Sequence, residues 1–144
     1  MSALSGVDTI REVAKRQKKT LLAFSTGKDA IAAWLAIREQ FEEVVPYYLY
    51  LVPGLEFVDE QIAMYERFFE TKITQLPHPS VHRLLNNFVF QPPQNCAVIE
   101  DAGLPNFDYP DIQAAMCQMH NLPKKTLVAD GVRAADSPMR RIAI

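Results

Sequence analysis

Residues 25–30 carry groups with which a protein could bind an anion: two hydroxyls, a glycine, a lysine and an aspartate. The segment is Ser25, Thr26, Gly27, Lys28, Asp29 and Ala30. Hydroxyl and ammonium groups donate hydrogen bonds to phosphate oxygens, and a glycine lets a ligand approach the backbone. These residue types in one short turn indicate a phosphate-binding site.

The residues on either side of this turn should form the elements that position it. Residues 21–24 are all apolar and predict a buried strand. Residues 29–41 predict a helix, because their apolar side chains recur at the spacing of one helical stripe. That stripe is Ala30, Trp34, Ile37 and Phe41. The first N–H groups of a helix lack partners within it and lie at the positive end of its dipole, so this arrangement favours anion binding.

Two familiar phosphate-binding motifs do not fit the turn. A Walker A loop needs a glycine and a hydroxyl residue at positions where this chain has Leu22 and Asp29. The dinucleotide-binding fingerprint needs three glycines, of which only Gly27 is present. An ordinary strand–helix turn that is small and polar is the alternative to a binding site.

The rest of the chain continues the alternation of strand and helix. We predict helices over 5–18, 57–70 and 111–121, and strands over 44–52, 72–76 and 126–129. This order predicts an α/β fold, with an open, mostly parallel sheet and helices on both faces. Ligands bind such sheets beyond the carboxyl ends of the strands, which is where residues 25–30 lie.

Residues 77–111 interrupt this alternation. They are rich in proline and show no clean period. We predict a short helix over 81–88 and otherwise an irregular region that serves as a substrate loop, as long irregular stretches often do. The length of 144 residues predicts a single domain over 1–144.

Composition limits the classes of partner. The chain is 49% hydrophobic with a net charge of −2, so it can bury a core, and nucleic acid is not indicated as a partner. We find no membrane-spanning stretch and no export signal, so no membrane partner is expected. Cys96 and Cys117 do not form a CxxC pair, and an iron–sulfur cluster is not expected. Free thiols without an export signal predict a cytoplasmic protein.

The turn resembles a known signature. Residues 25–30 are similar to the Ser-Gly-Gly-Lys-Asp-Ser motif of the PP-loop adenine-nucleotide hydrolase superfamily, in its PAPS reductase-like (phosphoadenylyl-sulfate reductase) branch. Thr26 stands in place of the first glycine, and Ala30 in place of the final serine. A second stretch resembles the same branch, with Gly131-Val132-Arg133 followed by Asp136-Ser137 and Arg140-Arg141. The resemblance spans roughly residues 20 to 141.

The resemblance implies an adenine nucleotide as ligand: ATP, adenosine phosphosulfate (APS) or PAPS. It assigns catalytic roles to Lys28, Asp29 and Arg133, and Asp29 would help to hold Mg²⁺ with ATP. The implied nucleotide-binding residues are Ala23, Phe24, Ser25, Thr26, Gly27, Lys28, Asp29, Tyr50, Leu51, Gly131, Arg133, Ser137, Arg140 and Arg141. Of these, the adenine would lie near Ala23–Phe24 and Tyr50–Leu51.

The expected chemistry is attack at the α-phosphate, or sulfur transfer from a sulfonucleotide. PAPS reductases use a cysteine on a C-terminal tail, which this sequence does not show before Ile144. We therefore expect no thioredoxin-dependent release of sulfite. The alternatives are a non-catalytic nucleotide-binding or partner module, and a scaffold whose turn binds nothing. Residues 142–144 are apolar, and proteins related to the resembled family often self-associate, so we predict a homodimer.

Overall fold

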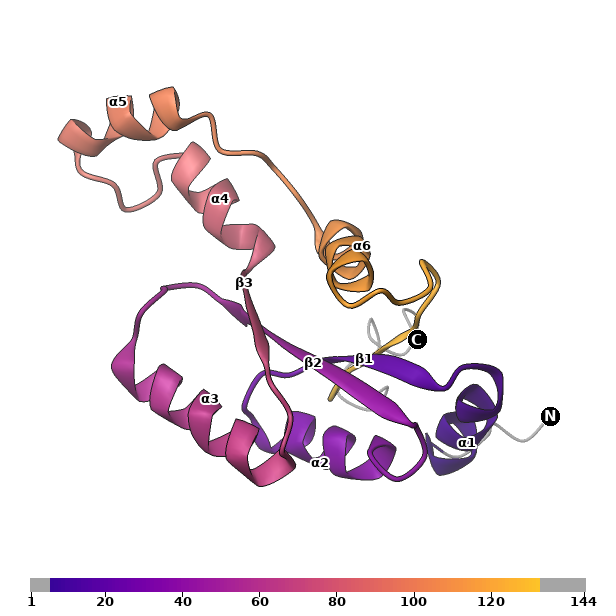
Figure 1. Cartoon of the computed structure of the whole chain (residues 1–144). Helices are drawn as coiled ribbons and strands as arrows, with labels where there is room; N and C mark the ends of the chain where they lie inside the picture. The colour runs from indigo at the N-terminus through magenta and orange to yellow at the C-terminus, as the bar shows by residue number, and fades with distance from the viewer. Residues whose placement is uncertain (1–5, 133–144) are drawn as a thin grey trace.

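A computed structural model describes residues 6–132 of the chain. Its centre is a sheet of four parallel strands: β1 (Lys19–Ala23), β2 (Glu43–Tyr50), β3 (Thr74–Pro77) and β4 (Val128–Ala129). The strands lie in the order β3-β2-β1-β4 (Figure 1). The chain thus adds strands outward from β1 to β3 and then returns to the other side of β1.

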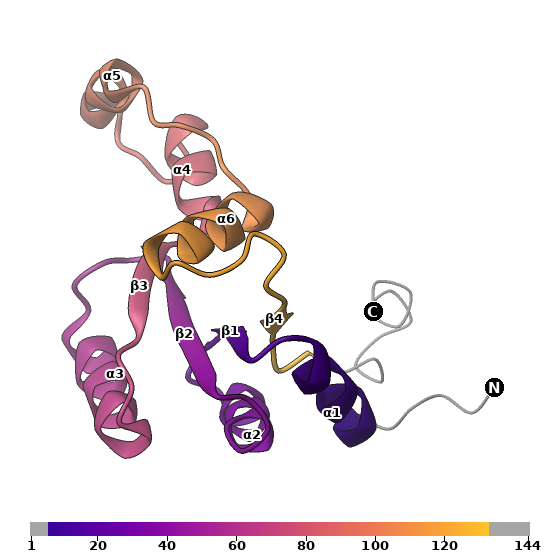
Figure 2. The same cartoon turned by 45° about the vertical axis from the view of Figure 1, so that its right-hand side comes forward.

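Helices cover both faces of this sheet. The described helices are α1 (Gly6–Arg16), α2 (Lys28–Ile37), α3 (Glu56–Phe69), α4 (Pro79–Asn86), α5 (Pro93–Ala102) and α6 (Tyr109–Met119). Residues of α1, α2 and α3 pack on one face and residues of α6 on the other (Figure 2). The predicted α/β fold, with a parallel sheet and helices on both faces, is confirmed.

The core on the α2 side contains the aromatic residues of the predicted helical stripes. Trp34 of α2 is buried and stacks on Phe69 of α3, with ring centroids 3.8 Å apart. Phe24, at the end of β1, meets Trp34 edge-on. Truncating such a buried aromatic side chain typically costs about 3–5 kcal/mol. This packing fixes α2 on the sheet, and with it the turn that leads into α2.

The core on the α6 side contains different residues of that helix from those that simple helical spacing predicts. The buried residues of α6 are Ile112, Met116 and Cys117. Helical spacing from Ile112 would place Ala115 and Met119 on the same inward face, but both are exposed. The sheet-facing side of α6 includes Cys117 instead.

Residues 77–111 form two helices where the sequence predicted one short helix and an irregular loop. That prediction was wrong for residues 93–102, which form α5. Pro79 and Pro93 each occupy the first helical position, where a proline has no N–H to leave unpaired. The prolines therefore begin helices here. Together α4 and α5 project from the sheet as an arm (Figures 1 and 2).

The described residues contain no helix with the length and apolar character needed to cross a bilayer.

Candidate functional site

The strand order places a crevice between β1 and β4. The chain leaves β1 in one direction, towards α2 and β2, whereas β4 lies on the opposite side of β1. Open parallel sheets bind ligands at such a switch point, beyond the carboxyl ends of the strands. The turn 25–27 follows β1 and the loop from Asp130 follows β4, so both lie at this edge.

A cavity of about 670 Å³ opens at this edge. Its lining combines the turn after β1, the first turn of α2, the inner part of β2, the start of α6 and the loop after β4. The lining residues are Ala23, Ser25, Asp29, Ala30, Tyr47, Leu49, Tyr109, Pro110, Gln113, Val128, Asp130, Gly131 and Val132. The turn after β1 and residues Gly131 and Val132, which begin the second resembling stretch, therefore line one cavity.

The start of α2 has the features of an anion site. Gly27 is the N-cap residue and has extended backbone geometry, and no side chain caps the helix there. The first N–H groups of such a helix lie at the positive end of its dipole, so they can bind a phosphate. Lys28 extends into solvent, with its side chain 83% exposed, and pairs with Asp29 Oδ1 at 2.8 Å.

Thr26 adopts a backbone conformation that suits glycine. Its φ is +61°, in the left-handed region. A β-branched residue is rarely found there, and such strain costs on the order of 1–3 kcal/mol. In the motif that the turn resembles, this position is a glycine. The turn thus keeps the backbone shape that a glycine would allow, although the residue is threonine.

Gly131 lies directly against the first turn of α2. A Cβ added to Gly131 would lie 2.7 Å from the carbonyl carbon of Asp29 and 2.8 Å from the backbone nitrogen of Ala30. Backbone atoms cannot move aside as a flexible side chain can, so only glycine fits here without a shift of the loop. The backbone of the loop after β4 therefore packs directly against the backbone at the start of α2.

The charges that line the cavity are negative within the described part of the chain. Asp29 and Asp130 contribute carboxylates, and no lysine or arginine of residues 6–132 lines the cavity. Asp130 Oδ1 accepts a hydrogen bond from the N–H of Val132 at 3.0 Å. The predicted ligands Arg133, Ser137, Arg140 and Arg141, and the apolar residues 142–144, lie outside the described residues.

Tyr47 is a buried residue of β2 that faces this cavity. Only 6% of it is exposed. Burial, with Asp130 and Tyr109 nearby, raises the pKa of Tyr47 to about 12, so the phenol stays protonated at neutral pH. Its hydroxyl can therefore donate a hydrogen bond at neutral pH.

A second cavity, of about 320 Å³, adjoins the first across Tyr47. Its other lining residues include Ala23, Phe24, Leu49 and His78. His78 Nδ1 accepts from the N–H of Ser80 at 3.1 Å, and its Nε2 lies 3.1 Å from Tyr109 Oη. In neutral His78 the proton therefore sits on Nε2, which donates to Tyr109.

The structure brings together only part of the predicted set. Ala23, Ser25, Asp29 and Gly131 line the larger cavity, and Phe24 lines the smaller one. Thr26, Gly27 and Lys28 lie in the adjoining turn and helix start. Tyr50 and Leu51 line neither cavity, and Leu51 is exposed at the end of β2.

Sequence reasoning missed Tyr47, Tyr109, Gln113 and Asp130 as cavity residues. Tyr47 lies within an apolar strand and was assigned to the fold alone. Asp130 directly precedes the Gly-Val-Arg motif. Its position at the end of a predicted strand could have marked it as a site residue, because ligands bind beyond strand ends. Cys117 is buried, and neither Cys117 nor Cys96 lines either cavity.

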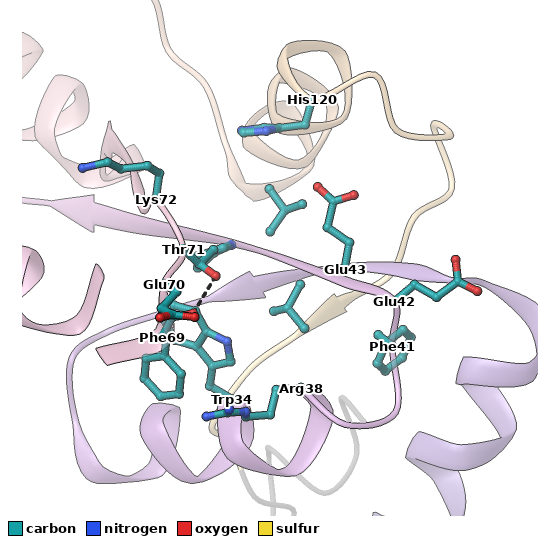
Figure 3. A pocket seen from close by; sticks show the side chains of 13 residues that line it. Trp34, Arg38, Phe41, Glu42, Glu43, Phe69, Glu70, Thr71, Lys72 and His120 are labelled. Carbon is teal, nitrogen blue, oxygen red and sulfur yellow. Dashed lines mark hydrogen bonds between the residues drawn. The ribbon is translucent and has the colours of Figure 1, made fainter. Parts of the chain in front are cut away.

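Another cavity, of about 530 Å³, lies at the opposite, amino end of the sheet (Figure 3). Its polar groups bond largely within the protein. Glu43 pairs with Lys19, Thr71 Oγ1 donates to the carbonyl of Phe69 at 3.0 Å, and His120 Nε2 lies 3.1 Å from Thr74 Oγ1. These contacts tie β1 to β2, hold Thr71 at the end of α3 and link β3 to the end of α6.

Within residues 6–132, no cluster of three or more His, Cys, Asp or Glu side chains could hold a metal ion by itself. The chain matches no model of a known protein family, and no curated protein matches it.

Proposed function

We propose that this chain is a PP-loop, PAPS reductase-like protein that binds an adenine nucleotide at the carboxyl edge of its sheet. The phosphates would bind the turn 25–28 and the start of α2, and the nucleoside would enter the cavity between Tyr47 and the loop after β4. The single observation that carries the proposal is the close packing of Gly131 on Asp29 and Ala30. It brings the first residue of the second resembling stretch against the turn at the switch point of the fold, which supports the proposal.

The chain's own groups would act electrostatically. The N–H groups at the start of α2, the Ser25 hydroxyl and Lys28 would stabilise charge on the phosphates, and Arg133 is proposed to join them. Asp29 supplies a carboxylate of the kind that Mg²⁺ prefers, and Mg²⁺ commonly binds one or two carboxylates together with substrate phosphates. When bound, Mg²⁺ would neutralise phosphate charge. Attack at the α-phosphate, or sulfur transfer, is the reaction class we propose.

A non-catalytic nucleotide-binding module is the second candidate. Ala30 lines the cavity where the resembling motif has a serine, so one phosphate-binding hydroxyl is missing. No cysteine among the described residues lines the cavity either. These two observations favour binding without thiol chemistry. A cytoplasmic location is also proposed.

A thermal-shift panel tests the proposal and separates the candidates. ATP with Mg²⁺, AMP and adenosine phosphosulfate should each raise the melting temperature, whereas ribose 5-phosphate at equal concentration should raise it less. Turnover of bound ATP or sulfonucleotide would identify an enzyme, and binding without turnover would identify the module. If no adenine nucleotide shifts the melting temperature at millimolar concentration, the scaffold interpretation holds.

A further inference from the structure

Asp130 lies where a nucleotide's sugar could reach it. It follows β4 directly, lines the larger cavity and faces the side of the cavity formed by Tyr47 and Tyr109. The hydrogen bond from the N–H of Val132 holds one carboxylate oxygen in the loop. A carboxylate has further lone pairs, so Asp130 can accept hydrogen bonds from a ligand as well.

The chemistry of this cluster suits a sugar with free hydroxyls. Carboxylates at the strand ends of nucleotide-binding sheets accept hydrogen bonds from ribose hydroxyls. Tyr47 and Tyr109 add phenolic hydroxyls to the same wall, and Tyr47 is 94% buried there. By contrast, a phosphate on this part of the ribose would face the charge of Asp130, and no lysine or arginine among residues 6–132 lines the cavity. Like charges brought together in this way oppose binding.

We propose that Asp130 makes the site selective for adenine nucleotides with a free ribose 3′-hydroxyl and excludes those with a 3′-phosphate. The inference rests on the proposed function, because it assigns the ligand class of the same site. ATP, AMP and adenosine phosphosulfate would then be ligands of this chain. PAPS, which carries a 3′-phosphate, would not.

Calorimetry with AMP and adenosine 3′,5′-bisphosphate tests this selectivity, since the two ligands differ only in the 3′-phosphate. The wild-type chain should bind AMP at least about tenfold more tightly. Asp130→Asn keeps an oxygen to accept from Val132 but removes the charge, and should bring the two affinities within about threefold. Asp101→Asn, an exposed carboxylate on α5, is the matched control and should behave as the wild type.

The outcomes separate the two claims. Binding of both nucleotides with equal affinity, or a preference that Asp130→Asn leaves unchanged, overturns the selectivity while leaving nucleotide binding intact. Failure of both ligands to bind the wild type overturns the proposed function, and the selectivity with it.

Helix α3 exposes an apolar stripe on its surface. Phe57, Met64 and Phe68 are 67%, 46% and 65% exposed and, with Gln61, lie on one face of the helix. The core-facing residues of α3 are different ones, among them Val58 and Ile62. Contiguous exposed apolar side chains of this kind mark contact surfaces.

The stripe is complementary to itself. In an antiparallel pair of α3 helices centred between residues 62 and 63, Phe57 would meet the second copy's Phe68. Gln61 would meet the second copy's Met64. Glu60 and Arg67 are exposed on one flank of the stripe, so each would fall beside the opposite charge of the other copy. We infer that α3 pairs with α3 of a second copy about a twofold axis.

Light scattering tests this interface. The wild type should be a dimer, and Phe57→Ser with Phe68→Ser should give a folded monomer, as checked by circular dichroism. Phe90→Ser, on the arm and 97% exposed, should leave the dimer intact. Glu60→Arg should weaken the dimer, and adding Arg67→Glu should restore it. A monomeric wild type, or a dimer that survives the double serine change, contradicts the inference.

Discussion

The cavities at the two ends of the sheet are of similar size but differ in what surrounds them. At the amino end, acidic and hydroxyl groups bond to partners on neighbouring elements, as in the pair of Glu43 with Lys19. At the carboxyl end, a helix starts without a side-chain cap, and Gly131 packs on its backbone. Volume alone would not distinguish the two cavities. The backbone geometry is the reason why we propose the carboxyl end as the site.

The largest effect is expected from Gly131→Val, which should break the carboxyl-end site. A valine side chain would overlap the backbone of Asp29 and Ala30, so the loop after β4 must move away from α2. Measurable nucleotide binding should be lost, with a stability cost of about 1–3 kcal/mol from overpacking. Calorimetry and urea unfolding measure the two effects.

Gly6→Val is the matched control. A Cβ at Gly6 meets no atom within 4 Å, so this change should leave nucleotide affinity unaltered. Full nucleotide affinity in Gly131→Val would show that the contact between the two loops is not part of the site.

A change near the amino end should alter stability and not binding. Glu66 Oε1 accepts from the N–H of Ile73 at 2.9 Å, and its Oε2 pairs with Lys72 at 2.7 Å. Burial opposes ionisation, but these two donors lower the pKa of Glu66 below its ordinary value. Glu66→Gln should destabilise the fold by about 1 kcal/mol at neutral pH, with unchanged nucleotide affinity.

The pH dependence of this effect has a definite sign. Because the pKa of Glu66 is lower in the folded chain, its stabilisation is fully present above the unfolded-state pKa and is lost as pH falls through the folded value. The difference in unfolding free energy between wild type and Glu66→Gln should therefore shrink as pH falls below about 4. A difference that grows on acidification would refute the assignment.

The smallest effect is a gain in stability at the binding turn. Thr26→Gly should relieve the strain at φ +61° and stabilise the fold by about 0.5–1 kcal/mol. Thr26→Ala, which keeps a Cβ, should gain less. Chemical denaturation compares the three chains, and a destabilised glycine variant would show that the threonine side chain holds the turn by contacts of its own.

Much of the fold could be predicted from the sequence, because periodic apolar residues such as Trp34 and Ile62 settle which segments form helices. Helix α5 could not, since Pro92 and Pro93 were taken as signs of irregular structure although Pro93 begins the helix. The turn at residues 25–29 could be proposed as a phosphate site from the sequence, because the residue types that suggest it are adjacent in the chain. Tyr47 and Asp130 were missed as site residues because their role depends on which strands become neighbours. The strand order that decides this is a long-range property.

The most direct test of the account is calorimetry of ATP with Mg²⁺ on three chains. Ser25→Ala with Lys28→Ala removes a hydroxyl and a cation from the carboxyl-end site, while Thr71→Ala with Lys72→Ala removes the same two kinds of group beside the amino-end cavity. We expect ATP affinity to be at least about tenfold weaker for the first variant and equal to the wild type for the second. Equal ATP affinity in the wild type and the Ser25/Lys28 variant would contradict a phosphate site at residues 25–29.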